Sequence, residues 1–115
     1  LHNINLTACA DLINVSGLGQ CPSLHILNLR YCRGVTDVSG LGQCASLHTL
    51  RLDGCDRVTD VSGLEQCASL YTLELSGCTN LGDVSCLGQC QVLRTLDVRN
   101  CFRVKTLTRR KKYRR

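Results

Sequence analysis

Cysteine is the residue type in this chain whose number and spacing point most directly to chemistry. The 115 residues include ten cysteines, and nine of them recur with a 23-residue period. A disulfide framework or a zinc site needs paired or clustered thiols, whereas this period is typical of positions in a repeated core. We therefore expect reduced, unmetallated and buried thiols, because free cysteine packs as a small hydrophobe. The two series are Cys9, Cys32, Cys55, Cys78 and Cys101, and Cys21, Cys44, Cys67 and Cys90.

Cys86 is the tenth cysteine and lies outside both series. It occupies the position that Gly17, Gly40 and Gly63 hold in the other turns. We expect this thiol to lie outside the core and to be the fastest to alkylate. Both a regulatory thiol and a neutral replacement of glycine stay open.

Three histidines share the period of the cysteines, and Tyr71 and Arg94 continue their column. Imidazoles on strands about 4.8 Å apart could share a metal ion. However, no carboxylate accompanies His2, His25 and His48, and repeat duplication explains their alignment. We expect no metal and no cofactor. The chain also lacks a phosphate-binding glycine motif and a converging set of acids, bases or nucleophiles, so we expect no enzyme.

The elements that position these side chains follow from the repeat itself. Each turn opens with Leu-x-x-(Leu/Ile)-x-(Leu/Val)-x-x-Cys. Leu50 and Leu52 alternate with Thr49 and Arg51, which is the pattern of a strand buried on one side. Parallel strands are therefore expected to begin near residues 3, 26, 49, 72 and 95.

The return half of each turn has apolar residues at a spacing of three, such as Val58, Val61 and Leu64. This spacing predicts a short helical or irregular segment on the opposite side of the core. Ser62 and Glu65 match a capping box, in which each side chain bonds a backbone N–H of the other. A column of short polar residues is interpreted as structural, because such side chains bond nearby turns. Its members are Asn14, Asp37, Asp60 and Asp83.

The repeated phrase and its cysteines resemble the leucine-rich repeat. The paired cysteines and the Val-Thr-Asp segment look like the cysteine-containing subtype of F-box substrate receptors and trypanosomatid repeat proteins, and the segment Val35–Leu41 is also similar to bacterial internalins. The resemblance covers residues 1–107. It implies an α/β solenoid of about four and a half repeats, with a curved parallel sheet of about five strands and short helical or irregular convex segments.

The strand positions that face away from the core vary between turns, so they are the better guide to recognition. They form a concave face that is polar and carries charges of both signs. The resemblance implies that such a face binds protein. The alternative is a solvated sheet face on which Arg51 and Glu74 merely pair. The candidate protein-binding residues are Arg30, Arg51, Asp53, Glu74, Asp97 and Arg99.

Charge divides the chain into two parts. Residues 1–98 contain nine carboxylates and five basic side chains, whereas residues 99–115 contain nine basic side chains and no acid. Residues 108–115 form a basic C-terminal tail that is not expected to continue the solenoid. Such a run is typical of contact with RNA, an acidic protein or an import receptor, and a merely solubilising tail is the alternative. The candidate polyanion-binding residues are Arg109, Arg110, Lys111, Lys112, Arg114 and Arg115.

These features predict a non-catalytic protein-interaction module or scaffold within a larger assembly. One alternative is a structural component of a ribosome or other ribonucleoprotein, anchored by the tail. Another is the substrate-recognition part of a ubiquitin ligase, although no F-box-like segment accompanies the repeats. Free thiols and the lack of a long apolar run favour a reducing intracellular compartment and no membrane contact. End-on packing of another polypeptide at the first strand is also expected.

Overall fold

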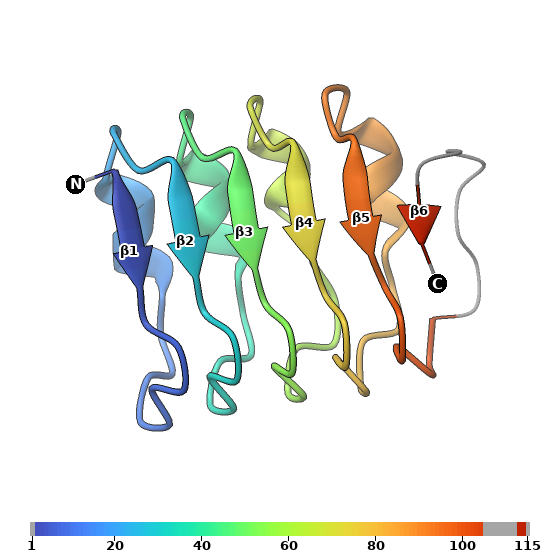
Figure 1. Ribbon diagram of the computed structural model, residues 1–115. Coiled ribbons are helices and arrows are strands. Elements are labelled where there is room, and N and C mark those ends of the chain that lie inside the picture. The colour runs from blue at the N-terminus through green and yellow to red at the C-terminus, as the bar shows by residue number, and fades with distance from the viewer. Residues whose placement is uncertain (1, 105–112, 115) are drawn as a thin grey trace.

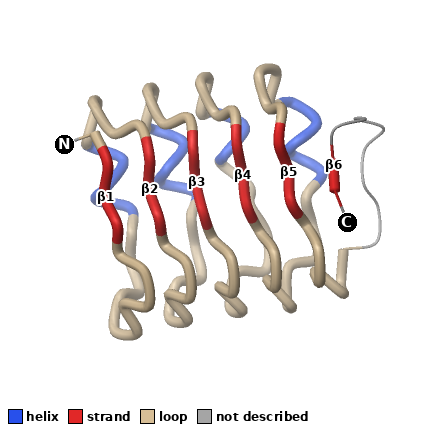
Figure 2. The backbone as a smooth tube through the Cα atoms, in the orientation of Figure 1, coloured by secondary structure: helices blue, strands red, loops and turns tan. Residues whose placement is uncertain are grey.

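The computed structural model describes residues 2–104 and 113–114, which form a solenoid of stacked turns (Figure 1). The strands of this part form one parallel sheet, in the order of the sequence. Short 3-10 helices lie behind the sheet, one in each of the first four turns (Figure 2). The strands are β1 (Asn3–Asn5), β2 (Ile26–Asn28), β3 (Thr49–Arg51), β4 (Thr72–Glu74), β5 (Thr95–Asp97) and β6 (Tyr113–Arg114).

The first five strands begin where the sequence predicts, and each pairs with the strand of the next turn at equivalent repeat positions. In β3, Leu50 is fully buried, while Thr49 and Arg51 on the other face are partly exposed. The pairing continues beyond the strand ends, where the Leu29 N–H donates to the Arg51 carbonyl at 2.8 Å. The period-two pattern and the expected registry are therefore confirmed.

The return segments are 3-10 helices, which explains their apolar spacing of three. Backbone bonds from residue i to i−3 run through the segment, as from Leu41 N to the Val38 carbonyl and from Cys44 N to the Leu41 carbonyl. Side chains three residues apart then point to the same side, here the core. The helices are η1 (Ser16–Gln20), η2 (Ser39–Gln43), η3 (Leu64–Gln66) and η4 (Ser85–Gln89).

The core is a single layer of leucine, valine and cysteine side chains between the sheet and the 3-10 helices. Leu50, Leu64 and Val58 are 0 % exposed, and they come from the strand, the helix and the connecting turn of one repeat. In the part of the chain that the structure describes, no helix is long and apolar enough to cross a membrane.

The serial cysteines link each turn to the turn before it. The Cys55 thiol donates to the Leu29 carbonyl at 3.0 Å, and the same carbonyl accepts the Cys32 N–H at 3.1 Å. The second series repeats this arrangement, as from Cys67 to the Leu41 carbonyl at 3.0 Å. Burial raises the pKa of Cys55 to about 11 and that of Cys67 to about 12. Seven of the nine serial thiols are therefore core residues, and those described also satisfy the second lone pair of a turn carbonyl, whereas Cys9 and Cys21 of the first turn are partly exposed and not buried as predicted.

The short polar column is structural, as predicted, but the capping box is not formed. Asp60 Oδ1 accepts both the N–H and the hydroxyl of Ser62, at 3.0 and 2.7 Å. Glu65 instead accepts the Gly63 N–H at 2.7 Å, and η3 begins after Ser62, at Leu64. Asp60 has already taken the Ser62 N–H, which is the donor that Glu65 would accept in a capping box. An analogous bond from Ser39 lowers the pKa of Asp37.

Cys86 lies outside the buried core, as predicted, but it is less open than a fully exposed thiol. Its side chain is only partly exposed and packs against the core, with the thiol 3.3 Å from the Val61 carbonyl. Burial, reinforced by the charge of Glu65, raises its pKa to about 12. The neighbouring turn differs here, because Gly63 is left-handed and η3 is the shortest of the four helices. Cys86 therefore lies against the preceding turn.

Two residues of the basic run, Tyr113–Arg114, add to the sheet, although the run does not carry the repeat phrase. Their backbone forms β6, which pairs in parallel with Leu96 and Asp97 of β5. Strand pairing uses backbone groups and does not require the apolar side chains of the repeat. The predicted boundary between residues 107 and 108 lies outside the described residues.

Close stacking of the turns predicts a specific cost for a methyl group at Gly42. A Cβ there would overlap the Gly63 carbonyl oxygen, whereas a Cβ at Gly17 would meet no atom within 4 Å. We expect Gly42→Ala to lower the free energy of unfolding by about 1–3 kcal/mol, since overpacking shifts the backbone. The matched Gly17→Ala variant should stay within about 1 kcal/mol of the parent. Urea unfolding measures both, and equal midpoints for the two variants would contradict the described stacking.

The thiol environments also predict an order of alkylation under native conditions. Cys9 and Cys21 are partly exposed, whereas Cys55 and Cys67 are buried and hold few thiolates at neutral pH. Iodoacetamide reacts with the thiolate, so Cys9 and Cys21 should be modified first and Cys86 should react slowly. Peptide mass spectrometry against time checks this order. Modification of Cys86 ahead of Cys9 would show that its surroundings are more open than described.

Candidate interaction surface on the sheet

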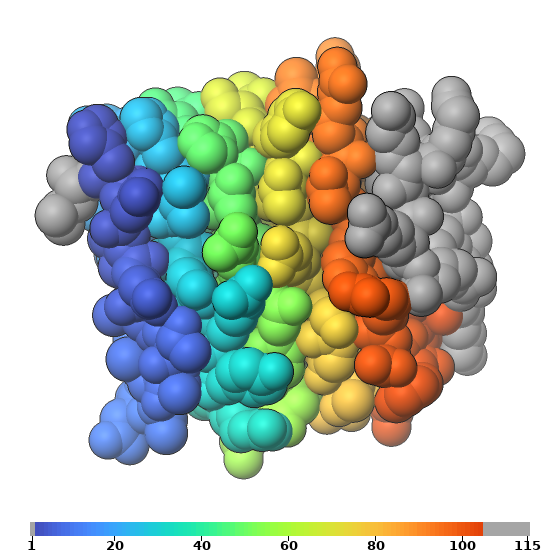
Figure 3. All heavy atoms as spheres, in the orientation of Figure 1, coloured from blue at the N-terminus to red at the C-terminus, as the bar shows by residue number. Residues whose placement is uncertain are grey.

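The exposed face of the sheet carries all six residues that the sequence proposed for protein binding. We call this face, predicted to be concave, the sheet face. The turns cross it as successive bands (Figure 3). Arg51, Glu74 and Asp97 lie at the last residue of β3, β4 and β5, and Arg30, Asp53 and Arg99 each follow two residues after a strand. The structure joins four of them in one network and the remaining two in a separate pair.

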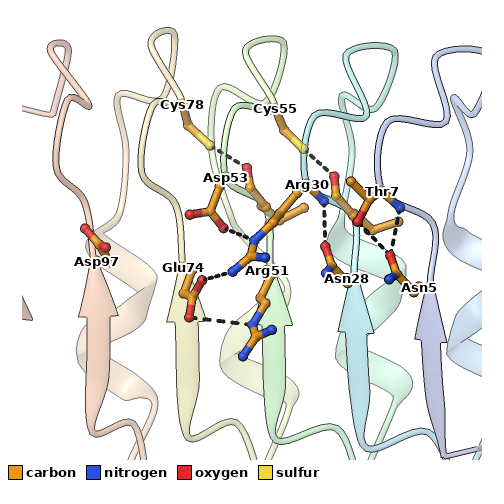
Figure 4. Close-up of polar contacts among 12 residues, drawn as sticks. Asn5, Thr7, Asn28, Arg30, Arg51, Asp53, Cys55, Glu74, Cys78 and Asp97 are labelled. Carbon is orange, nitrogen blue, oxygen red and sulfur yellow. Dashed lines mark hydrogen bonds and ion pairs between the residues drawn. The ribbon is translucent and has the colours of Figure 1, made fainter.

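Arg30 is the centre of the four-residue network (Figure 4). Its Nε lies 3.4 Å from Asp53 Oδ1, and its Nη2 donates to Glu74 Oε1 at 3.1 Å. The side chain thus reaches from the end of β2 across β3 to β4. The hydrogen bond to Glu74 is the main reason that the pKa of Arg30 is raised. This contact spans 44 residues of sequence, so the regular offset between neighbouring turns does not predict it.

Arg51 is the fourth member of the network, and its contact with Glu74 is longer than that of Arg30. Its Nε lies 3.6 Å from Glu74 Oε2, which is an ion pair but too long for a hydrogen bond. This Nε is buried and has no hydrogen-bond acceptor within the described part of the chain. The expected pairing of Arg51 with Glu74 is therefore present, but it leaves a buried donor unused.

The acidic members differ in their surroundings. Burial is the main cause that raises the pKa of Asp53, and the nearby charge of Glu74 adds to it, against the opposing effect of Arg30. Asp97 is 8 % exposed and accepts three bonds from Arg99, including one of 2.6 Å from Nη2. Ion pairs that face water contribute only about 0–1 kcal/mol, so these pairs orient the side chains more than they stabilise the fold.

The sheet face changes character along the solenoid. In the first turn it carries neutral polar side chains, where the hydroxyl of Thr7 donates to Asn5 Oδ1 at 2.6 Å (Figure 4). In the second turn, Asn28 accepts the Arg30 N–H at 3.0 Å. The charged residues begin with Arg30 in this second turn and continue through the later turns. The face therefore has a direction, with a neutral end and a charged end.

The histidine column forms a stack one residue before each strand. The rings of His2 and His25 are 4.9 Å apart, and those of His25 and His48 are 5.6 Å apart, both nearly parallel. The Arg94 guanidinium lies 5.8 Å from the centre of the Tyr71 ring and extends the column. A metal ion binds in the plane of an imidazole, so parallel stacked rings present their lone pairs side by side and do not converge. Among the described residues, no group of three potential ligands is placed to hold a metal ion.

A groove beside the charged network was missed by the sequence analysis. It has a volume of about 360 Å³, and its lining includes Tyr31, Asp53, Gly54 and Gly77. Tyr31, Gly54 and Gly77 have left-handed backbones, with φ of 61°, 73° and 78°. The signal in the sequence was a further column at the repeat spacing that contains the residue types most tolerant of this conformation. That column is Ala8, Tyr31, Gly54, Gly77 and Asn100.

The candidate residues of the tail are placed only in part. Arg109, Arg110, Lys111, Lys112 and Arg115 lie outside the described residues. The backbone of Arg114 belongs to β6, opposite Asp97. The polyanion site therefore stays a prediction from the sequence.

Comparison with known proteins relates the chain to one repeat family. The family model described as leucine-rich repeat matches residues 20–41. No curated protein matches the sequence. Among solved structures, an internalin (inlF) of Listeria monocytogenes superposes with a TM-score of 0.67 and 22 % identity over 84 % of this chain. Internalin C2 of the same organism gives a TM-score of 0.62 and 16 % identity over 89 % of this chain.

The chain spans 27 % of the first internalin and 58 % of internalin C2, so the likeness concerns the repeat region. At these identities the superpositions establish the fold. The neighbours do not assign the repeat subtype. The 23-residue period, the repeat model that matches residues 20–41 and the parallel sheet with 3-10 turns agree that this chain has the fold of a leucine-rich-repeat solenoid.

Proposed function

We propose that this chain is a non-catalytic protein-interaction module whose sheet face binds the partner. Leucine-rich repeats generally serve as protein-interaction modules, and the described repeats have the fold of that class. The proposal uses Arg30, Arg51, Asp53 and Glu74 as its central residues. These side chains converge on the exposed face of three neighbouring strands.

The observation that carries the proposal is the Nε of Arg51, which is buried, lies 3.6 Å from Glu74 and has no hydrogen-bond acceptor in the described part of the chain. A buried donor without an acceptor costs about 1–3 kcal/mol. The Arg51 side chain as a whole is 37 % exposed, so a shift of its guanidinium toward a partner carbonyl or carboxylate would supply the missing acceptor, and this gain exists only in the complex. The Glu74 carboxylate already serves Arg30 at 3.1 Å and lies 3.6 Å from Arg51, so it does not satisfy both donors equally.

The rigid backbone behind the network favours specific recognition. Leu50 and Leu73, which alternate with the charged positions of β3 and β4, are fully buried. The side chains on the face are thus held at fixed strand spacing, and their ion pairs limit their rotamers before binding. Such preorganisation lowers the entropic cost of association. The neutral and charged ends of the face would further orient an elongated partner.

Neutral replacements of similar shape test the sheet face. Arg51→Gln combined with Glu74→Gln should weaken partner binding about tenfold or more, equivalent to ~1.4 kcal/mol, while the unfolding midpoint changes little. Binding is measured by titration calorimetry with a partner recovered by affinity purification. A charge reversal of these two residues is less clean, because it would place a cation at position 74 beside Arg30.

The matched control carries the same changes in charge away from the sheet face. Arg57 and Asp11 are both exposed and lie in connecting turns. Arg57→Gln with Asp11→Asn should leave the affinity within about twofold of the parent. If the control variant loses binding and the sheet variant keeps it, the partner uses another surface.

The basic tail supports a second, separable proposal, which is contact with a polyanion such as RNA. Residues 109–115 hold six basic side chains and no acid, whereas the repeats to residue 98 have an excess of carboxylates. Clustered cations on a chain that is acidic elsewhere favour local contact with phosphates. Such a contact would anchor the module within a ribonucleoprotein and leave the sheet face available for protein.

Removal of four tail charges tests this second proposal. Alanine at Arg109, Arg110, Lys111 and Lys112 should abolish nuclease-sensitive association and leave binding through the sheet face unchanged. Against single-stranded RNA, the slope of log K against log salt should fall by roughly 3, from about 0.7 per phosphate contact. A control that exchanges Lys for Arg and Arg for Lys at the same positions should keep the parent slope. RNA binding that survives the alanine changes with its salt dependence intact would place the contact elsewhere.

A further inference from the structure

The groove beside the charged network is lined by glycine backbone and by one aromatic side chain, Tyr31. Within the described part of the chain, a Cβ added at Gly77 would meet only backbone atoms of Gly54, at 3.7 and 3.8 Å, so none of these residues fills the space above Gly77 with a side chain. The Tyr31 ring packs one edge on Gly54, and 49 % of Tyr31 is exposed. Asn100 lies at the other end of the lining. The result is a slot that is open to solvent and about 360 Å³ in volume.

Tyrosine is an unfavourable residue type for the left-handed backbone conformation at position 31. A bulky aromatic residue at φ 61° is strained, and the next two turns place glycine at the same position. The N–H groups of Tyr31 and Gly54 make equivalent bonds of 2.8 Å to the following turn, so the fold accepts either residue. Strained residues cluster at binding sites. The tyrosine ring is therefore better explained by what it contacts outside the chain than by stability.

The charges around the slot favour a cation. Among the described residues, two carboxylates, Asp53 and Asp56, line it together with one basic residue, Arg33. Arg33 pairs with Asp56 at 2.7 Å, while Asp53 is 3.4 Å from Arg30, a looser contact. Burial and the charge of Glu74 disfavour the ionised form of Asp53 and raise its pKa. A second cation beside Asp53 would favour its ionised form.

The geometry points to a guanidinium-binding slot between Tyr31 and Gly77, which receives an arginine side chain of the protein partner. This inference rests on the proposed function, because the partner on the sheet face supplies the side chain, and Asp53 belongs to both the network and the slot. The planar guanidinium would stack on the open part of the Tyr31 ring and donate to Asp53. An aromatic face attracts a cation within about 6 Å of its centre, and arginine is the usual occupant.

A titration with a small probe tests the slot without the partner. Isotope-labelled protein is titrated with N-acetylarginine amide and, in parallel, with N-acetylcitrulline amide, which has nearly the same shape and no charge. The amides of Gly54 and Gly77 are the reporters, since both are held by backbone bonds of 2.8 and 2.9 Å. We expect saturable shifts of both amides with the arginine compound and little change with the citrulline compound.

Variants at Tyr31 separate recognition from stability. Tyr31→Gly removes the ring where glycine suits the backbone, so its melting temperature should equal or exceed that of the parent while the arginine response falls at least several-fold. Tyr31→Phe should keep the response, because the ring face and not the hydroxyl is used. Tyr71→Ala is the matched control: Tyr71 is 48 % exposed, similar to Tyr31, but lies in the histidine column. It should leave the shifts of Gly54 and Gly77 unchanged.

Three results would overturn the inference: equal shifts with citrulline and arginine, no saturable shift, or an unchanged response in Tyr31→Gly. A lower melting temperature for Tyr31→Gly would also overturn it, since Tyr31 would then be retained for stability. Failure of the proposed function is recognised separately. In that case the sheet variant Arg51→Gln with Glu74→Gln would keep partner binding, whatever the small-probe titration gives.

Discussion

The carbonyl that accepts two hydrogen bonds at each bend holds the turns of this solenoid together. The Leu29 carbonyl receives the Cys32 N–H from its own turn and the Cys55 thiol from the next. Each such bond contributes little alone, and thiols are weak donors. Yet a buried carbonyl with a second donor allows two turns to approach closely, and only a small side chain with a hydrogen to donate fits there. Two series of such bonds, one on each side of the core, keep the strands at constant spacing.

Much of the fold could be predicted because the same alternation of buried and exposed positions recurs in each of the five repeats. The start of every strand from β1 to β5 follows from the alternation seen at Leu50 and Leu52. The local details were harder. Ser62 and Glu65 match a capping motif, but Asp60 takes the Ser62 N–H that Glu65 would accept and is closer along the chain. Cys86 resembled an exposed replacement of glycine, because the sequence does not show that the turn before it has a left-handed Gly63 and a shortened helix.

The sequence shows which residues belong to the candidate surface, but it does not show which of them contact one another. Alternation along the strands shows which side chains share the exposed face, so Arg51, Asp53 and Glu74 could be named in advance. The reach of Arg30 across an intervening strand to Glu74 depends on side-chain length and rotamer, which the repeat period does not encode. The groove beside Tyr31 depends on backbone handedness. A column that mixes alanine, tyrosine, glycine and asparagine gives a weak signal of that handedness, because only three of its five members favour it.

The offsets of the bonds between turns have an evolutionary consequence. In bonds such as that from Leu29 to Arg51, a backbone N–H of one turn donates to a carbonyl of the next turn. The thiols of Cys55 and Cys67 instead donate to a carbonyl of the turn before them. Deleting or duplicating one whole repeat unit brings equivalent atoms back to the same places, so every surviving bond finds a partner. An insertion of any other length would misalign the thiols, the strands and the 3-10 turns together. The gene can therefore lengthen or shorten this solenoid in steps of one turn, while the side chains on its face diverge freely.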